Sequence, residues 1–215
     1  MLWQLADSAF PTGGFAHSGG LEAAWRAGHV VEDQTLEGYC RSQLLQCASG
    51  VLPLALMAHR DSDLFTEADE RCDLLLNHPI SNRASRVQGR GLLAAARQIY
   101  PACRDEIKDR PRAAQLPGHF GPTLGAVCRV LKIDEIHVGR LLLFMGLRGT
   151  MSAAVKLGIV GSMAAQAMQH RLGAFCDELV DRSRRLPVDA VAQTAPISEL
   201  FAACQDRLYS RLFQT

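Results

Sequence analysis

The chain has 215 residues, enough for one hydrophobic core and too few to require two domains. Hydrophobic residues make up 48% and charged residues 21%, both ordinary for a globular protein. With 23 Lys and Arg against 22 Asp and Glu, the formal net charge of +1 excludes the electrostatic footprint of a nucleic-acid-binding protein.

The N-terminal stretch MLWQLADSAF lacks the basic start and the continuous apolar run of a signal peptide. A glycine-rich segment follows, PTGGFAHSGGLEAAW (residues 11–25), and leads directly into an apolar helix start. Glycines this close together indicate backbone conformations that other residues resist, or the close approach of another molecule. We expect Ser18 to cap a helix over residues 19–29, with Glu22 in its first turn.

Helical periodicity continues through most of the chain. Apolar residues recur every three or four positions after Thr35, Asp134 and Ser162, and Thr35 and Asp134 are expected to be helix N-caps. Further helices are expected at residues 63–77, 82–100 and 122–131. Alternating strand patterns are nearly absent, so the predicted fold class is all-α, a single-domain helical bundle of about eight to ten helices.

Composition also predicts a surface loop, a buried helix and free thiols. Residues 101–121 are rich in charge, proline and glycine, which predicts a long and partly mobile surface loop. The most apolar region, residues 141–167, is broken by Arg148, Lys156 and several glycines, which favours a buried helix over a membrane span. The seven cysteines include no CxxC pair, so we expect reduced core thiols in a cytoplasmic protein.

The glycine-rich segment matches none of the common motifs for phosphate binding, nucleophilic catalysis or metal binding. A phosphate-binding P-loop needs a lysine after its glycines and a strand before them, and both are missing. The stretch AHSGG resembles a nucleophile elbow at Ser18, but an elbow needs a strand, and the neighbouring His17 is poorly placed to act as its base. The histidines are scattered without HxxxH or HExxH spacing, so no metal site is expected within one chain. A metal site that takes one ligand residue from each subunit of a symmetric dimer is left as an alternative.

The stretch NRASRVQGRGLL, residues 82–93, has the composition of a contact surface. Three arginines share one helix face beside Gln88 and small residues, namely Arg83, Arg86, Arg90, Gly89 and Gly91. One interpretation is a solvated basic face. The other is a close helix contact at the glycines, with the arginines paired to carboxylates of this chain or another.

The C-terminal segment DRLYSRLFQT is unusual for a chain end, because ends are usually polar. Its apolar residues are flanked by arginines, in the order Arg207, Leu208, Tyr209, Arg211, Leu212 and Phe213. Apolar anchors combined with arginine are typical of docking segments. We therefore expect a docking tail at residues 207–215 that is covered by a partner or by a dimer.

Five separated segments, in order, resemble the urease accessory protein UreF family. They are LADSAFPTGGFAHSGGLE, NRASRVQGRGLL, GHFGPTLGAVCRVL, LRGTMSAAVKLGIVG and DRLYSRLFQT. The resemblance implies a non-catalytic, all-α scaffold that forms homodimers, binds UreD (also called UreH) and the GTPase UreG, and docks on apo-urease to help deliver nickel. It implies no intrinsic cofactor, because partner proteins handle nickel and GTP, and both an activating and a gating role toward UreG are compatible with it.

The resemblance also implies where partners bind, in segments that the residues themselves single out. The expected partner-binding residues are Pro11, Gly14, Phe15, His17, Ser18, Gly20, Glu22, Arg83, Arg86, Gln88, Arg148, Lys156, Arg207, Tyr209, Arg211, Leu212 and Phe213. Glu22 and Lys156 are expected to be exposed, and the faces around Gly89, Gly91 and residues 143–155 to form a two-fold dimer. The alternatives are an enzyme built on AHSGG and a helical adaptor unrelated to nickel.

Overall fold

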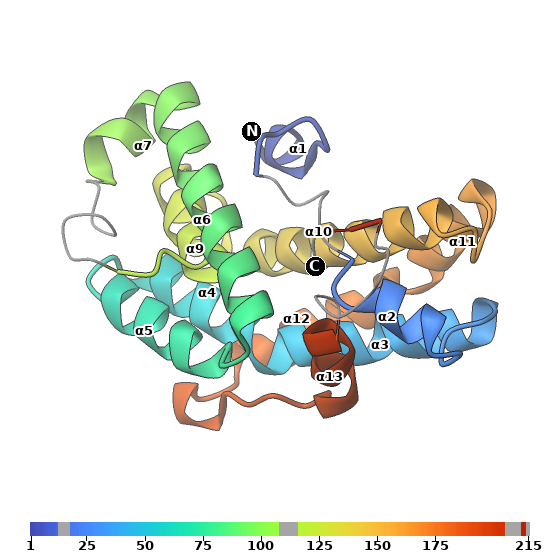
Figure 1. Cartoon of the computed structure of the whole chain (residues 1–215). Coiled ribbons are helices and arrows are strands. Elements are labelled where there is room, and N and C mark those ends of the chain that lie inside the picture. Colours follow the sequence, from blue (N-terminus) through green and yellow to red (C-terminus); the bar gives the residue numbers. More distant parts are fainter. Residues whose placement is uncertain (13–17, 108–115, 205–211, 214–215) are drawn as a thin grey trace.

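The structure is a computed structural model of the chain, and it describes residues 1–12, 18–107, 116–204 and 212–213. Within these ranges it is helical and contains no strand, which confirms the predicted all-α class (Figure 1). The described residues form nine α-helices of nine residues or more: α3 (Asp33–Ser49), α4 (Val51–Arg60), α5 (Phe65–Leu75), α6 (Pro79–Ile99), α9 (Phe120–Val130), α10 (Glu135–Lys156), α11 (Ser162–Arg171), α12 (Gly173–Arg184) and α13 (Pro196–Cys204). Shorter elements are α1 (Leu2–Ala6), α2 (Leu21–Arg26), α7 (Pro101–Glu106) and the 3₁₀ turn η2 (Val188–Ala190).

Helix α4 forms the centre of the fold. Residues 52–58 are all buried, because α3, α5, α9, α10 and α12 surround this helix. Its closest neighbour is α9, where a Cβ added at Gly125 would lie 1.9 Å from the carbonyl oxygen of Ala55. A glycine at this position therefore allows the two backbones to touch, and any other residue would force the helices apart.

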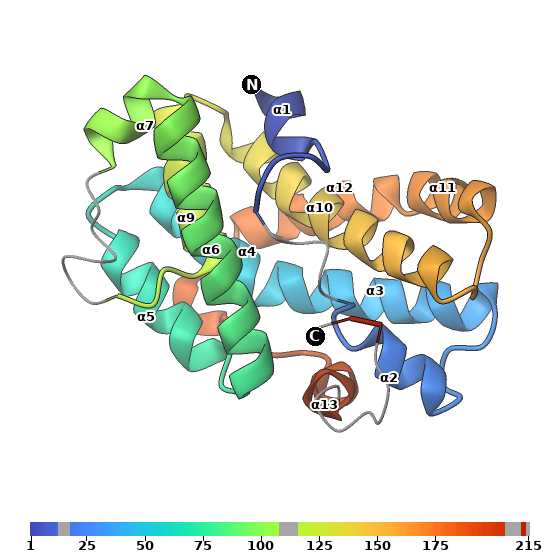
Figure 2. The same ribbon diagram turned by 45° about the horizontal axis from the view of Figure 1, so that its top comes forward.

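Two groups of helices extend from this centre. Helices α6, α7 and α9 pack together on one side, and α3, α10, α11 and α12 on the other (Figures 1 and 2). Helix α13 packs against both groups and against α2. In this arrangement α6 faces α3 and α10 across a groove.

Several predicted helix ends are shifted. The Asp134 cap is confirmed, because its carboxylate accepts the His137 N–H at 3.0 Å. The N-cap of α3 is Glu32, not Thr35 as predicted. Thr35 is the third residue of the helix, and its side chain completes a capping box by accepting the backbone N–H of Glu32. The predicted cap at Ser18 is wrong, because Gly20 is the N-cap residue of α2 and makes no side-chain hydrogen bond.

The predicted loop at residues 101–121 is also partly wrong. Residues 101–106 form α7, opened by a proline at its first position, and α9 already begins at Phe120. Proline and charge alone suggested a loop, although proline at the first helical position is favourable. The segment 108–115 lies outside the described residues.

Helix α10 is the one helix, in the parts of the chain that the structure describes, that is long and apolar enough to cross a membrane. Half of its most apolar window is buried inside the protein, as in the core helix of a globular fold. The buried helix that the sequence predicts in this region is therefore present.

Candidate functional site

The glycine-rich segment packs against its own chain where the structure describes it. Gly19 and Gly20 adopt left-handed backbone angles, with φ of 62° and 89°. A Cβ at Gly20 would lie 2.7 Å from the backbone nitrogen of Ala202 in α13, so a side chain there would push α13 away. Pro11 is exposed, whereas Ser18 is buried. Three predicted contact residues, Gly14, Phe15 and His17, lie outside the described residues.

Glu22 is buried, so the expectation that it is exposed is wrong. Its side chain is fully inaccessible, and its carboxylate accepts the backbone N–H groups of Leu212 at 2.9 Å and Phe213 at 3.2 Å. Arg26, one turn further along α2, donates to the same carboxylate at 3.5 Å. A buried carboxylate is stable only when it is paired and hydrogen-bonded, and the chain end supplies these bonds.

The chain end is docked on this site. The Phe213 side chain belongs to the main hydrophobic core, and the Lys156 ammonium lies 5.5 Å from the centre of its ring. The expectation that only a partner or a dimer covers Phe213 is therefore wrong, whereas the neighbouring Leu212 is exposed. Lys156 is exposed as predicted. We call the set Glu22, Lys156, Leu212 and Phe213 the clasp; Arg207, Tyr209 and Arg211 lie outside the described residues.

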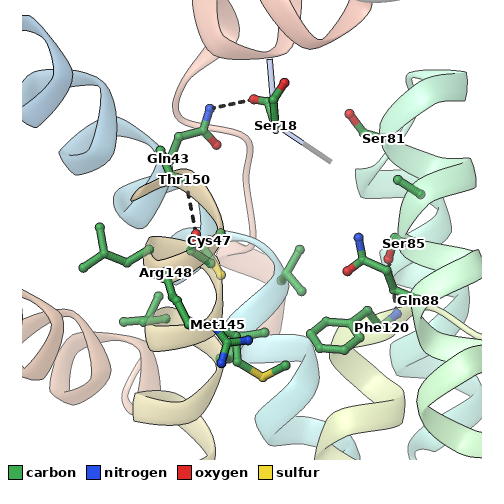
Figure 3. A pocket seen from close by; sticks show the side chains of 18 of the residues that line it. Ser18, Gln43, Cys47, Ser81, Ser85, Gln88, Phe120, Met145, Arg148 and Thr150 are labelled. Atoms are coloured by element: carbon green, nitrogen blue, oxygen red, sulfur yellow. Dashed lines mark hydrogen bonds between the residues drawn. The ribbon is translucent and has the colours of Figure 1, made fainter. Parts of the chain in front are cut away.

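A groove of about 350 Å³ lies beside the clasp, between α6 on one side and α3 and α10 on the other (Figure 3). It brings together four predicted contact residues from distant segments: Ser18, Gly20, Gln88 and Arg148. Side chains that the sequence analysis missed also line it, including Gln43, Cys47, Ser81, Ser85, Met145 and Thr150. A helical stripe of small polar residues, at positions 81, 85 and 88 of α6, was the available signal.

A buried polar network supports the α6 wall of the groove. The inaccessible His119 imidazole lies 3.1 Å from Ser85 Oγ through Nδ1 and 3.0 Å from Asp73 Oδ1 through Nε2. Ser85 Oγ also accepts the Phe120 N–H at 3.2 Å. Hydrogen bonds from Asn82 and His119, the larger from Asn82, lower the pKa of the Asp73 carboxyl. The network fixes the start of α9 against α5 and α6.

The glycines of α6 have different surroundings. A Cβ at Gly89 would lie 2.1 Å from the Gly118 carbonyl oxygen, so Gly89 serves the contact between α6 and the start of α9 within one chain. Assigning Gly89 to a dimer face is therefore wrong. At Gly91 the nearest atom would be 3.5 Å away.

The arginines of α6 are only partly exposed to solvent. Arg83 and Arg90 are exposed, which agrees with a basic outer face on α6. Arg86 is half-buried, and its Nε atom is buried without a hydrogen-bond partner. The charge of Arg86 contributes to the lowered pKa of Asp73, so this side chain acts partly within its own chain.

Neither metal nor nucleophile chemistry is assembled in the described ranges. They contain no group of three or more His, Cys, Asp or Glu side chains placed to hold a metal ion. Ser18 Oγ is buried without a hydrogen-bond partner, so no base among the described residues is bonded to it. All seven cysteines are unpaired thiols, as expected, and burial raises the pKa of Cys40, Cys47 and Cys128 to about 12. Such thiols are unreactive near neutral pH.

The fold and the site define an all-α protein whose glycine-rich segment and chain end are clasped together beside a groove. The UreF family model matches residues 30–173. Urease accessory protein F of Arabidopsis thaliana is 34% identical over 216 residues, covering 98% of this chain and 90% of the relative. The protein of that name from Oryza sativa subsp. indica is 30% identical over 99% of this chain and 84% of the relative. The chain belongs to the UreF family.

A bacterial protein with the same family name is also similar to this chain. Urease accessory protein UreF of Mycobacterium tuberculosis H37Rv is 29% identical over 184 residues, covering 85% of this chain and 84% of the relative. The family model ends before the C-terminal tail and begins after the glycine-rich segment. The alignments with the plant proteins, which cover nearly the whole chain, reach beyond both limits.

Proposed function

We propose that this chain is a non-catalytic accessory protein of urease maturation, which joins a UreD-type protein and the GTPase UreG in the complex that inserts nickel into apo-urease. The family membership supports a role in urease maturation. The observation that carries the proposal is the near-complete coverage by proteins named as urease accessory proteins. The burial of Ser18 favours a scaffold over an esterase built on this serine.

The partner contacts follow from surfaces that the structure leaves accessible. Two residues of the clasp, Leu212 and Lys156, are exposed, and Pro11 is exposed at the start of the glycine-rich segment. These residues form the surface for the UreD-type partner and for UreG. We further propose that the chain works as a cytoplasmic homodimer, that it modulates the GTPase activity of UreG, and that nickel and GTP are held by its partners.

Urease activation in cells tests the proposal. A urease gene cluster is expressed with and without this chain, and urease activity and nickel content are measured in each extract. We expect both to fall when the chain is absent and to be restored when it is supplied. Equal activity without the chain would exclude a role in maturation.

Co-purification separates the scaffold from its alternatives. The tagged chain should retain UreD and UreG homologues and show no turnover of its own. Ester hydrolysis that disappears in Ser18→Ala would instead support the enzyme, and a chain that binds neither protein would support an unrelated adaptor.

A further inference from the structure

The charge in the groove between α6 and the pair α3 and α10 is engaged within the chain. Among the described residues that line the groove, Arg148 is the one charged side chain. Its guanidinium donates to the carbonyl oxygen of Ala6 and lies 5.6 Å from the centre of the Phe144 ring. Burial lowers the pKa of Arg148, and the negative charge of Asp7 opposes this effect by stabilising the cation. Arg148 therefore already has partners in its own chain.

An ionised ligand would lose its water in this groove without gaining a new opposite charge. A carboxylate would have to compete with Ala6 and Asp7 for Arg148. An ammonium group would find no Asp or Glu among the described residues of the lining. Dehydration of a charge is costly unless an opposite charge or strong hydrogen bonds replace the water. The lining therefore favours an uncharged ligand.

Ser18 leaves a polar group on the wall for such a ligand. Its side chain lines the groove and is 2% exposed, and its Oγ has no hydrogen-bond partner among the described residues. A buried hydroxyl is normally hydrogen-bonded, so its lack of a partner here points to a group that arrives from outside. The hydroxyl of Ser18 can donate to a neutral carbonyl oxygen.

The α6 wall of the groove presents an acceptor at Ser85. The carboxyl of Asp73 has a lowered pKa and accepts from His119 Nε2 at 3.0 Å, so Nδ1 of the neutral imidazole is itself an acceptor. Ser85 consequently donates its hydroxyl proton to that nitrogen at 3.1 Å. One lone pair of Ser85 Oγ accepts the Phe120 N–H. What remains for a ligand is the second lone pair, beside Gln88 on the same wall (Figure 3).

Most of the remaining lining is apolar. It includes aromatic and aliphatic side chains of α3, α9, α10 and the N-terminal segment, among them Phe10, Leu44, Phe120, Leu142 and Leu147. Sites for small molecules have this composition, with apolar walls and a few polar groups that fix orientation. The volume of about 350 Å³ lies in the range of such sites.

We propose that this groove binds a small uncharged molecule with an apolar body and a primary amide head group. The amide oxygen accepts from Ser18, the amide N–H groups face the acceptor oxygens of the α6 wall, and the body lies against Phe120 and the leucines. The proposal goes beyond the role in urease maturation and is independent of it, since none of its evidence depends on a protein partner.

Four probes with one body and different head groups test the proposal. Isothermal titration calorimetry on the full chain at neutral pH uses 4-phenylbutanamide, its N,N-dimethyl form, 4-phenylbutyrate and 4-phenylbutylamine. We expect the primary amide to bind at least tenfold more tightly than each of the other three. Tighter binding of the carboxylate would show that Arg148 selects the ligand, and equal binding of all four would show apolar contact alone. Either result, equal binding of the N,N-dimethyl form, or no binding of the primary amide at millimolar concentration would overturn the proposal.

Variants place the binding in the groove. Ser18→Ala removes a hydroxyl that has no hydrogen bond to lose, so it should keep the wild-type melting temperature and weaken binding of 4-phenylbutanamide at least fivefold. Ser162→Ala removes an exposed hydroxyl from α11 and should leave binding unchanged. Ala84→Phe, which fills the groove from α6, should abolish binding. Unchanged amide binding in Ser18→Ala or in Ala84→Phe would overturn the site.

Discussion

The carboxylate of Glu22 accepts the backbone N–H of Leu212 at 2.9 Å, which joins two residues 190 positions apart in the sequence. Hydrogen bonds to an ionised acceptor are roughly twice as strong as neutral ones. The first turn of α2 thereby holds Leu212 and Phe213 in place. Folding therefore depends on residues that are also proposed to bind partners, and substitutions at these residues can separate the two roles.

Replacing Glu22 should destabilise the fold. Glu22→Ala leaves the N–H groups of Leu212 and Phe213 without their acceptor, and we expect a loss of about 2–3 kcal/mol in the free energy of unfolding. The melting temperature should fall by several degrees, measured by circular dichroism. Glu178→Ala, which removes an exposed carboxylate from α12, is the control and should melt like wild type. A wild-type melting temperature in Glu22→Ala would contradict the clasp.

Two neighbouring residues of the tail should have opposite phenotypes. Phe213→Ala removes a buried ring from the core and should cost about 3 kcal/mol of stability. Leu212→Ala changes a side chain that is 61% exposed and should cost under about 0.5 kcal/mol, while it weakens binding to the UreD-type partner. Denaturant unfolding and a pull-down measure the two effects. Equal stability losses in the two variants would show that the tail acts as one structural unit.

Lys156 should matter more for activation than for folding. Its ammonium lies over the Phe213 ring in a solvent-exposed position, where such a contact contributes about 0.5–1 kcal/mol. Lys156→Ala should therefore lower the melting temperature only slightly and reduce urease activation, and Lys156→Arg, which keeps the charge, should activate normally. If Lys156→Ala activates urease as well as wild type, this residue is not a partner contact.

Two glycines of α6 form a matched pair. Gly89→Ala places a methyl group 2.1 Å from the Gly118 carbonyl oxygen, so we expect at least about 2–3 kcal/mol of destabilisation. Gly91→Ala meets no atom closer than 3.5 Å and should be neutral or slightly stabilising, because alanine favours the helix by up to about 1 kcal/mol. Thermal unfolding compares the two, and a neutral Gly89→Ala would mean that α6 and α9 are farther apart than described.

The contribution of Asp73 to the free energy of unfolding should depend on pH in the acidic range. Its pKa is lower in the folded protein than its ordinary value of 3.8, so its contribution is present above that value and is lost as the pH falls below it. Asp73→Asn should therefore lower the free energy of unfolding at pH 6 and flatten its decline as the pH falls below about 4. Urea unfolding across this range measures the slope, and Asp63→Asn, in an exposed position, is the control. Parallel slopes in wild type and Asp73→Asn would contradict the bonds to Asn82 and His119.

Local features of the sequence determined the helical class and part of the helix boundaries. The apolar spacing of three and four residues repeats within a single helix, so it requires no knowledge of what the helix packs against. The Asp134 cap is equally local, because the bond from His137 spans three residues. The cysteines are odd in number and widely spaced, which likewise indicated free thiols. The UreF resemblance needed only the order of five segments.

The site depended on contacts that no local pattern contains. A glutamate in a first helical turn is usually solvated, and only the chain end, arriving from 190 residues away, makes Glu22 a buried acceptor. In the same way, Gly89 and Gly91 differ only because α9 crosses α6 at one of them. The groove exists because α6 packs on α9 rather than on α3 and α10. Burial and close approach are properties of packed surfaces, so the tertiary structure alone decided them.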